Sequence, residues 1–363
     1  MRRVTTELSG RLRGAVEGLT PGYFALVMAT GIISVGMRLE GFVVISDALL
    51  AVTAAGYAVL VVLTGWRLVA YRRAVSDDFN DPRRAFGFFT FVAATNVLGV
   101  RLGADGHHAA TAALLVVSGA SWLVLGYVVP WTAALGRQQR PIVADANGTW
   151  FIWVVASQSV AIAAATIEPV FGTGRRELAV LAVTSWSVGV FLYAAAGIFV
   201  ALRLMLYRFG PEDLTAPYWV SMGALAISVL AGARIVEMAD APMVQATRGL
   251  IAGLTVVLWA FATWLIPALV AAGWWRHVAR RLPLPYDATL WSIVFPLGMY
   301  GVAGIYLGQA DQLPVVGMVG HVELWVALVA WIVVFVAMLW HLWLSVVVGA
   351  RARRDERPGA VAH

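Results

Sequence analysis

The sequence predicts an all-α integral membrane protein with ten transmembrane helices, arranged as five helical hairpins around a central pore. Its composition is the first observation: 61% of the 363 residues are hydrophobic and 13% are charged, against about 45 to 50% and about 25% in soluble domains. Second, ten apolar stretches are each long enough to cross the roughly 30 Å of a bilayer's hydrocarbon. Third, most charged residues lie in the short segments between these stretches.

The apolar stretches define the predicted spans in chain order. They are Pro21–Met37, Ile45–Trp66, Arg84–Val100, His108–Val129, Thr149–Ile167, Leu178–Leu206, Tyr218–Val236, Ala246–Ala272, Thr289–Leu307 and Val322–Val348. The odd-numbered spans begin near residues 21, 84, 149, 217 and 289, so a helical hairpin recurs every 63 to 72 residues. This spacing favours an internal repeat in which the odd-numbered helices lie inside and line a central axis. Any two-helix topology with short loops gives a similar spacing, which is the alternative.

The arginines predict the orientation, because positive charge is retained on the cytoplasmic side of a membrane. The chain has no lysine, and 20 of its 26 arginines fall in segments on the same side as the amino terminus. We therefore expect a multi-pass protein of the plasma (cell inner) membrane with both termini in the cytoplasm. The predicted parts are a cytoplasmic lead-in at 1–19, a ten-helix transmembrane domain at 20–349 and a cytoplasmic tail at 350–363.

The sequence lacks the residues that several classes of protein function require. Without cysteine there is no disulfide, thiolate metal site or cysteine nucleophile. No HExxH or GxSxG motif occurs, and no paired aspartates lie within a span. A nucleic-acid partner requires a clustered basic face, whereas these arginines are scattered. We expect no catalytic residue, metal or cofactor, and the lipid bilayer as the surroundings.

Neutral polar residues occupy the middle of the odd-numbered spans, where charged residues are absent. Charges at that depth are typical of proton relays, whereas neutral groups suit a pore. The predicted pore-lining polar residues are Thr30, Thr95, Asn96, Ser157, Gln158 and Ser228. The alternative is that they form hydrogen bonds between packed helices, as is common in membranes. The large amide of Gln158 suits that alternative least.

Three of the five odd-numbered spans end in an arginine, namely Arg38, Arg101 and Arg234. If these ends converge on one axis, the three cations form an outer vestibule that attracts anions and repels cations. The alternative for each is an arginine in the last turn of a helix that interacts with the helix dipole and extends to the interface.

The ninth span contains Phe295 directly before Pro296, followed by Gly298, Gly301 and Gly304. A proline inside a helix removes a hydrogen bond and produces a kink, and the glycines remove bulk from one face. A phenyl ring beside such a kink can close a narrow pore sterically and by dewetting. The alternative is that Phe295 only packs in the core.

Two stretches resemble a known family. Thr20–Gly36, TPGYFALVMATGIISVG, and Leu290–Ala303, LWSIVFPLGMYGVA, are similar to the first and ninth helices of the tellurite-resistance/dicarboxylate transporter family. That family includes plant slow anion channels and yeast malate and sulfite permeases. The resemblance implies five hairpins around a pore, a gating phenylalanine at Phe295, anion permeation and a homotrimer. The inner helices of that family are expected to be kinked by prolines near the middle of the membrane. This chain departs from that pattern, because only its ninth span, among the inner spans, has an internal proline.

The leading hypothesis is transport of small anions, chloride- or nitrate-like or C4-dicarboxylate, through a pore gated by Phe295. The alternative within transport is a proton-coupled carrier or exporter of dicarboxylate, sulfite or tellurite-related anions. Coupling requires a titratable group, and the candidates are Glu237, His321, Glu323 and His341, all near membrane faces. A membrane scaffold without transport activity is a third hypothesis, and it predicts no flux in liposomes.

Overall fold

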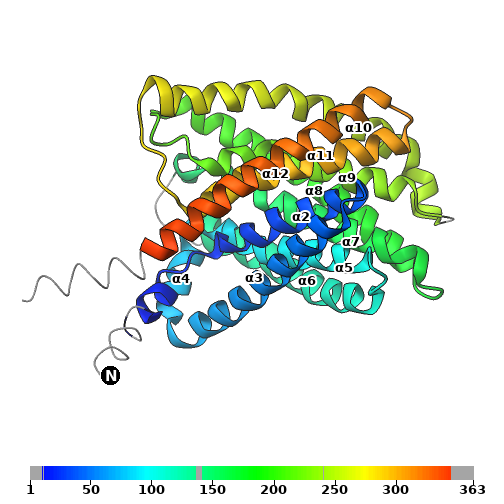
Figure 1. Ribbon diagram of the computed structural model, residues 1–363, viewed down its shortest axis with the longest axis horizontal. Coiled ribbons are helices and arrows are strands. Elements are labelled where there is room, and N and C mark those ends of the chain that lie inside the picture. Colours follow the sequence, from blue (N-terminus) through cyan, green and yellow to red (C-terminus); the bar gives the residue numbers. More distant parts are fainter. Residues whose placement is uncertain (1–9, 11, 136–140, 240, 345–363) are drawn as a thin grey trace, which may run out of the picture.

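The computed structural model describes residues 10, 12–135, 141–239 and 241–344 (Figure 1). These residues contain no β-strand, and ten of their helices are long and apolar enough to cross a membrane. The predicted all-α class with ten spans is confirmed. The predicted tail at 350–363 and most of the predicted lead-in at 1–19 lie outside the described residues.

Five helices form the buried centre, and they are the odd-numbered spans. We call them the inner helices: α2 (Ala25–Leu39), α5 (Phe89–Gly103), α7 (Phe151–Ile167), α9 (Val220–Val236) and α11 (Trp291–Ala310). Each follows directly on a 3-10 turn, at Pro21–Phe24, Ala85–Phe88, Gly148–Trp150, Ala216–Trp219 and Ala288–Leu290. Between 72% and 89% of the most apolar window of each of these spans is buried. Their apolar side chains therefore pack against protein rather than lipid.

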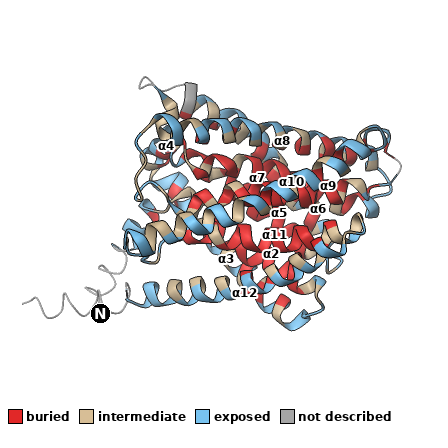
Figure 2. Cartoon of the chain, turned by 90° about the horizontal axis from the view of Figure 1, so that it is seen from above, coloured by how far each residue is buried: buried red, intermediate tan, exposed pale blue. Residues whose placement is uncertain are grey.

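The other five spans surround this centre. We call them the outer helices: α3 (Val43–Ala70), α6 (His108–Val129), α8 (Arg175–Leu206), α10 (Pro242–Trp274) and α12 (Pro314–Trp343). Only 11% to 22% of the corresponding windows is buried, and Figure 2 shows α8 and α12 at the margins of the buried helices. Helices that are apolar but exposed in this way are suited to contact with hydrocarbon.

The inner helices contact one another in a closed order. α2 packs against α5, α5 against α7, α7 against α9, α9 against α11, and α11 returns to α2. Each inner helix also packs against the outer helix that follows it in the chain. The chain therefore surrounds one central axis with five parallel inner helices.

Two features differ from the sequence prediction. The segment after α3 forms a short helix, α4 (Arg72–Asn80), where a loop was expected. Asp78 of α4 is buried and lies 2.6 Å from Arg67 and 3.0 Å from Arg84, so an ion-pair cluster holds α4 against the end of α3. The last span begins at Pro314 rather than Val322, because proline is well suited to the first turn of a helix.

Glycines allow α11 and α12 to approach closely. A Cβ atom on Gly301 would lie 2.9 Å from the backbone nitrogen of Leu324, and one on Gly320 would lie 2.6 Å from that of Ile305. Gly304 faces Gly320 in the same contact. The glycine-rich face of the ninth span therefore packs against its outer partner.

Candidate functional site

A cavity of about 230 Å³ lies between the inner helices, in the half where those helices end. Every inner helix contributes to its wall, and most of the wall is apolar. The polar and charged residues that line it are Arg38, Asn96, His108, Ser159, Thr166, Arg234 and Tyr306. Leu39, which is 39% exposed, lies in the wall near the end of α2. A single water needs only about 10 to 15 Å³ by such a measure, so the cavity has room for several small molecules.

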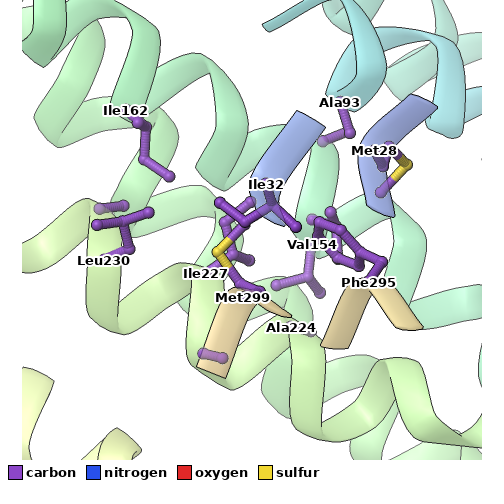
Figure 3. Packing of buried hydrophobic residues seen from close by; sticks show 14 of the residues in the cluster. Met28, Ile32, Ala93, Val154, Ile162, Ala224, Ile227, Leu230, Phe295 and Met299 are labelled. Carbon is purple, nitrogen blue, oxygen red and sulfur yellow. The ribbon is translucent and has the colours of Figure 1, made fainter. Parts of the chain in front are cut away.

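A layer of packed side chains lies about one helical turn from the deep wall of this cavity. Met299 of α11 lines the cavity, and Phe295 precedes it by four residues, which is one turn. Phe295 is 1% exposed. Figure 3 shows Phe295 among the buried side chains of the four other inner helices, namely Met28 of α2, Ala93 of α5, Val154 of α7 and Ala224 of α9. One apolar side chain from each inner helix thus fills the core at this depth.

Pro296 is held by the neighbouring inner helix. A Cβ atom on Gly223 of α9 would lie only 2.8 Å from Cγ of Pro296. The absence of a side chain at Gly223 therefore leaves room for the proline ring, and α9 and α11 meet directly beside Phe295. α11 is the inner helix with an internal proline in this structure.

Two of the three predicted vestibule arginines line the cavity. Arg38 lies 3.0 Å from a carboxylate oxygen of Asp105, and Arg234 lies 3.1 Å from Glu237. The guanidinium of Arg234 also lies 5.4 Å from the ring centre of Tyr306. Both arginine side chains are partly exposed, so each retains N–H donors for a ligand.

Arg101 occupies a different position from the one predicted. Its side chain is fully buried, and it donates hydrogen bonds to the hydroxyls of Ser34 and Ser46 and to the carboxylates of Asp47 and Asp105. The reason is that a buried charge is stable only when paired and hydrogen-bonded. Arg101 therefore joins α2, α3 and α5 rather than lining the cavity.

Most of the predicted pore-lining polar residues contact other helices. Trp331 of α12 donates to Thr30 Oγ1 at 2.9 Å, Tyr57 of α3 bonds Thr95 at 2.9 Å, and Trp122 of α6 donates to Ser157 Oγ at 2.9 Å. Trp186 of α8 donates to the carbonyl oxygen of Ser228 at 3.0 Å. A similar bond joins Thr263 of α10 to Tyr300 of α11 at 2.6 Å.

These five bonds follow one rule. In each, a residue of an inner helix bonds a residue of the outer helix that belongs to the preceding hairpin, and α12 bonds α2 to complete the circle. We call these contacts the seam bonds. The inner residues, Thr30, Thr95, Ser157, Ser228 and Tyr300, recur every 62 to 72 residues, which is the spacing of the hairpins.

Gln158 and Asn96 complete the set of predicted polar residues. Gln158 donates to the carbonyl oxygen of Trp186, and Gly189 of the same helix leaves the space for its amide. Asn96 donates to Ser159 of α7 and accepts from Ser118 of α6. Asn96 also lines the cavity, so it is the one residue of the predicted polar set to which the structure gives a place in the cavity wall.

A second and larger cavity, of about 650 Å³, lies at the opposite end, where α7, α9 and α11 begin. Its wall includes Asp145, Arg83 and Arg276. Arg83 pairs with Asp145 at 3.0 Å, and Arg276 donates to backbone carbonyls of the segment that precedes α9, among them Pro211 at 2.9 Å. Along α11, Phe295 lies between Ile293, which lines this second cavity, and Met299, which lines the first.

Comparison with known protein families gives a match over nearly the whole chain. The profile of the SLAC1 family, described as voltage-dependent anion channel, matches residues 18–339. The chain belongs to this family. The match covers the first nine spans and all but the last four residues of the tenth, and it confirms the resemblance to the tellurite-resistance/dicarboxylate transporter family described above.

Individual relatives of this voltage-dependent anion channel family protein are named as membrane proteins or transporters. An uncharacterized membrane protein of Mycobacterium tuberculosis (strain H37Rv) is 58% identical over 171 residues, which are 47% of this chain and 86% of that protein. An uncharacterized transporter of Methanocaldococcus jannaschii is 23% identical over 330 residues, or 88% of this chain and 92% of that protein. A second transporter of that organism is 23% identical over 332 residues, or 90% of this chain and 95% of that protein.

Membership in the voltage-dependent anion channel family indicates transport of anions across a membrane by a multi-pass protein. Four polar residues of the cavity wall were not predicted as site residues from the sequence: His108, Ser159, Thr166 and Tyr306. His108 stands at the first position of α6, where the predicted fourth span also begins. Ser159 lies two residues from Ser157, and a helical wheel of α7 places the two side chains on different faces.

Proposed function

We propose that the chain forms a passive pathway for small anions along the axis of the inner ring, with Phe295 as its gate. The cavity beside Arg38 and Arg234 is the chamber on one side of the gate. The observation that carries this proposal is the layer around Phe295. This layer contains a buried apolar side chain from each inner helix and lies about one turn of α11 from Met299 of the cavity wall (Figure 3).

The physical basis is the cost of removing water from an anion. An ion that enters a narrow apolar layer loses its hydration without compensating hydrogen bonds, and this cost greatly exceeds thermal energy. The layer therefore blocks anions as long as the ring of Phe295 occupies the axis. Pro296 packs directly against Gly223, so α11 and α9 meet beside the ring of Phe295 with no side chain on the α9 side.

The proposal includes the orientation of the inner helices in the membrane. The arginine distribution supports an orientation in which the starts of the inner helices, and the larger cavity, lie at the cytoplasmic face. All five inner helices then direct their positive dipole ends toward the cytoplasm, which favours anions there. At the other face the carbonyl ends of these helices are accompanied by Arg38, Arg101 and Arg234 in their last turns.

The test is anion flux in liposomes that contain the purified protein, at a fixed membrane potential. Nitrate, chloride and malate are compared for the wild type, Phe295→Ala and the control Phe191→Ala, whose ring is 79% exposed on α8. We expect a several-fold higher flux in Phe295→Ala that follows the imposed potential, and wild-type flux in Phe191→Ala. Equal flux in all three proteins contradicts a gate at Phe295.

The same measurement separates the other hypotheses. A proton-coupled carrier requires a pH gradient for flux, whereas the proposed pathway does not. Of the four coupling candidates, Glu237 pairs with Arg234 and His321 pairs with Glu40, and none of the four lines the cavity. Absence of flux in every variant favours the scaffold. The proposed homotrimer is tested separately by the mass of the purified particle in detergent.

A further inference from the structure

His108 is the cavity residue whose partner is missing. It occupies the first position of α6, and its side chain lines the cavity together with Arg38 and Arg234. Its Nδ1 atom is buried and has no hydrogen-bond partner in the protein. The adjacent His107 is exposed and is not part of the cavity wall. Buried polar atoms are nearly always satisfied, so an unpartnered one in a cavity wall indicates a bound molecule.

The arginines near this cavity are balanced by carboxylates. Arg38 pairs with Asp105 and Arg234 pairs with Glu237. Arg101 pairs with both Asp105 and Asp47. Three guanidinium groups are thus matched by three carboxylates, and this network has no formal net charge. An excess positive charge at this end of the inner ring must come from another residue.

The surroundings of His108 have few other titratable groups. On α5 and the loop that follows it, they are Arg101 and Asp105, which pair with each other. α7 contributes neutral residues to the cavity, and Glu168 after its end is bonded to Arg175. Across the cavity stand Arg38 of α2, Arg234 of α9 and Tyr306 of α11, with Glu237 paired to Arg234.

We propose that His108 binds the transported anion in this cavity, between Arg38 and Arg234, and that its imidazolium form supplies the positive charge that the balanced arginines do not. This inference rests on the proposed anion pathway and identifies a ligand of the anion within it. An imidazolium donates charge-assisted hydrogen bonds to an anion, which are stronger than bonds between neutral groups. Because only the protonated imidazole carries this charge, occupancy of the site is expected to increase as the pH falls.

The test compares nitrate flux at about pH 5.5 and about pH 8, on either side of the usual histidine range, with equal pH on both sides of the membrane. For the wild type we expect a flux roughly tenfold higher at the lower pH, the low end of the range by which a charged cleft raises association rates. His108→Gln loses this dependence and stays at the high-pH level. His108→Arg carries a fixed charge and gives a pH-independent flux near the low-pH level.

Two control variants test whether the effect belongs to His108. His107→Gln changes the neighbouring exposed ring, and His321→Gln removes the pair with Glu40. Both are expected to retain the pH dependence of the wild type. The inference is overturned if His108→Gln retains the wild-type pH dependence, or if either control loses it.

A binding measurement keeps this test separate from that of the pathway. A ligand that binds only the folded state stabilises it by RT ln(1 + L/Kd), where L is the free ligand concentration, and so raises the unfolding temperature. In detergent at about pH 5.5, nitrate is expected to raise the unfolding temperature of the wild type and of His107→Gln, but not that of His108→Gln. Stabilisation without any flux refutes the pathway and supports the site. Flux with equal nitrate stabilisation in all three proteins overturns the site and leaves the pathway.

Discussion

Nε1 of Trp331 on α12 donates a hydrogen bond of 2.9 Å to Oγ1 of Thr30 on α2, and these residues are separated by 301 positions in the chain. The bond joins the last hairpin to the first. Oγ1 of Thr30 in turn donates to the carbonyl oxygen of Leu26. The other four seam bonds join consecutive hairpins in the same way, so this one closes the circle of five.

Removing this closing bond is expected to weaken the fold modestly. In Trp331→Phe the ring is kept and the donor is lost, while Thr30 retains its bond to Leu26, so we expect a loss of about 0.5 to 1.5 kcal/mol. The measurement is the midpoint of thermal unfolding in detergent. Trp264→Phe, at a lipid-facing position that is 68% exposed, serves as the control and is expected to unfold as the wild type does. Equal midpoints for both variants would show that the seam bond contributes nothing.

Arg101 is expected to matter for stability rather than for conduction. Arg101→Met removes the ion pairs with Asp47 and Asp105 and the charged donor to two buried serines, so we expect a loss of about 1.5 to 3 kcal/mol of unfolding free energy. Arg38→Gln removes a partly exposed ion pair and is expected to cost less than about 1 kcal/mol. Denaturant unfolding of the two variants is the measurement, and a similar cost for both contradicts the structural role of Arg101.

The close contact of α11 and α12 predicts a strong effect at Gly320. Gly320→Ala places a methyl group 2.6 Å from the backbone of Ile305, and we expect this overpacking to cost about 1 to 3 kcal/mol. Gly253→Ala in α10 meets no atom within 4 Å and is expected to leave stability unchanged or to raise it, because alanine favours helices. The prediction fails if thermal unfolding ranks the two variants in the opposite order.

Glu237 is expected to reduce anion entry by occupying Arg234. In Glu237→Gln the guanidinium of Arg234 is free to attract an anion, so flux is expected to rise roughly two- to fivefold, the factor that an exposed ion pair of about 1 kcal/mol or less provides. The increase is expected to shrink at high salt, which screens exposed charges. Glu177→Gln, an exposed change at the start of outer helix α8, is the matched control. A lower flux in Glu237→Gln than in the wild type would instead support a carboxylate that takes part in coupling.

Much of the fold was predictable because local composition determines it. Residues close together in the chain determine the ten apolar stretches, the short connections between them and the alternation of inner and outer helices. The structure confirms ten helices at these stretches. The predicted start at Val322 lies eight residues after the observed start of α12 at Pro314, and the residues between include Gly317 and Gly320, which are weak helix formers. The short helix α4 was missed because its stability depends on Arg67 and Arg84, which lie outside it.

The candidate site was only partly predictable. The position of Phe295 before Pro296 indicated a special point in the ninth span, and in the structure Phe295 is buried one turn from Met299, which lines the cavity. The polar residues Thr30, Thr95, Ser157 and Ser228 were expected in a pore, and they form seam bonds instead. Each transmembrane helix has several faces. Its own sequence does not indicate which face packs against a neighbouring helix and which lines a cavity.

The sequence by itself determined that this chain resides in a membrane, how many times it crosses, and which family it belongs to, because hydropathy and short motifs are local properties. The tertiary structure decided which charges are available to an anion. Arg101 and Arg234 have the same position in their spans, yet Arg101 is enclosed by Ser34, Ser46 and two aspartates, whereas Arg234 lines a cavity. His108 joins that cavity only because α6 packs against α5 and α7. Burial and pairing of a charge depend on residues distant in the chain, and only packing brings them together.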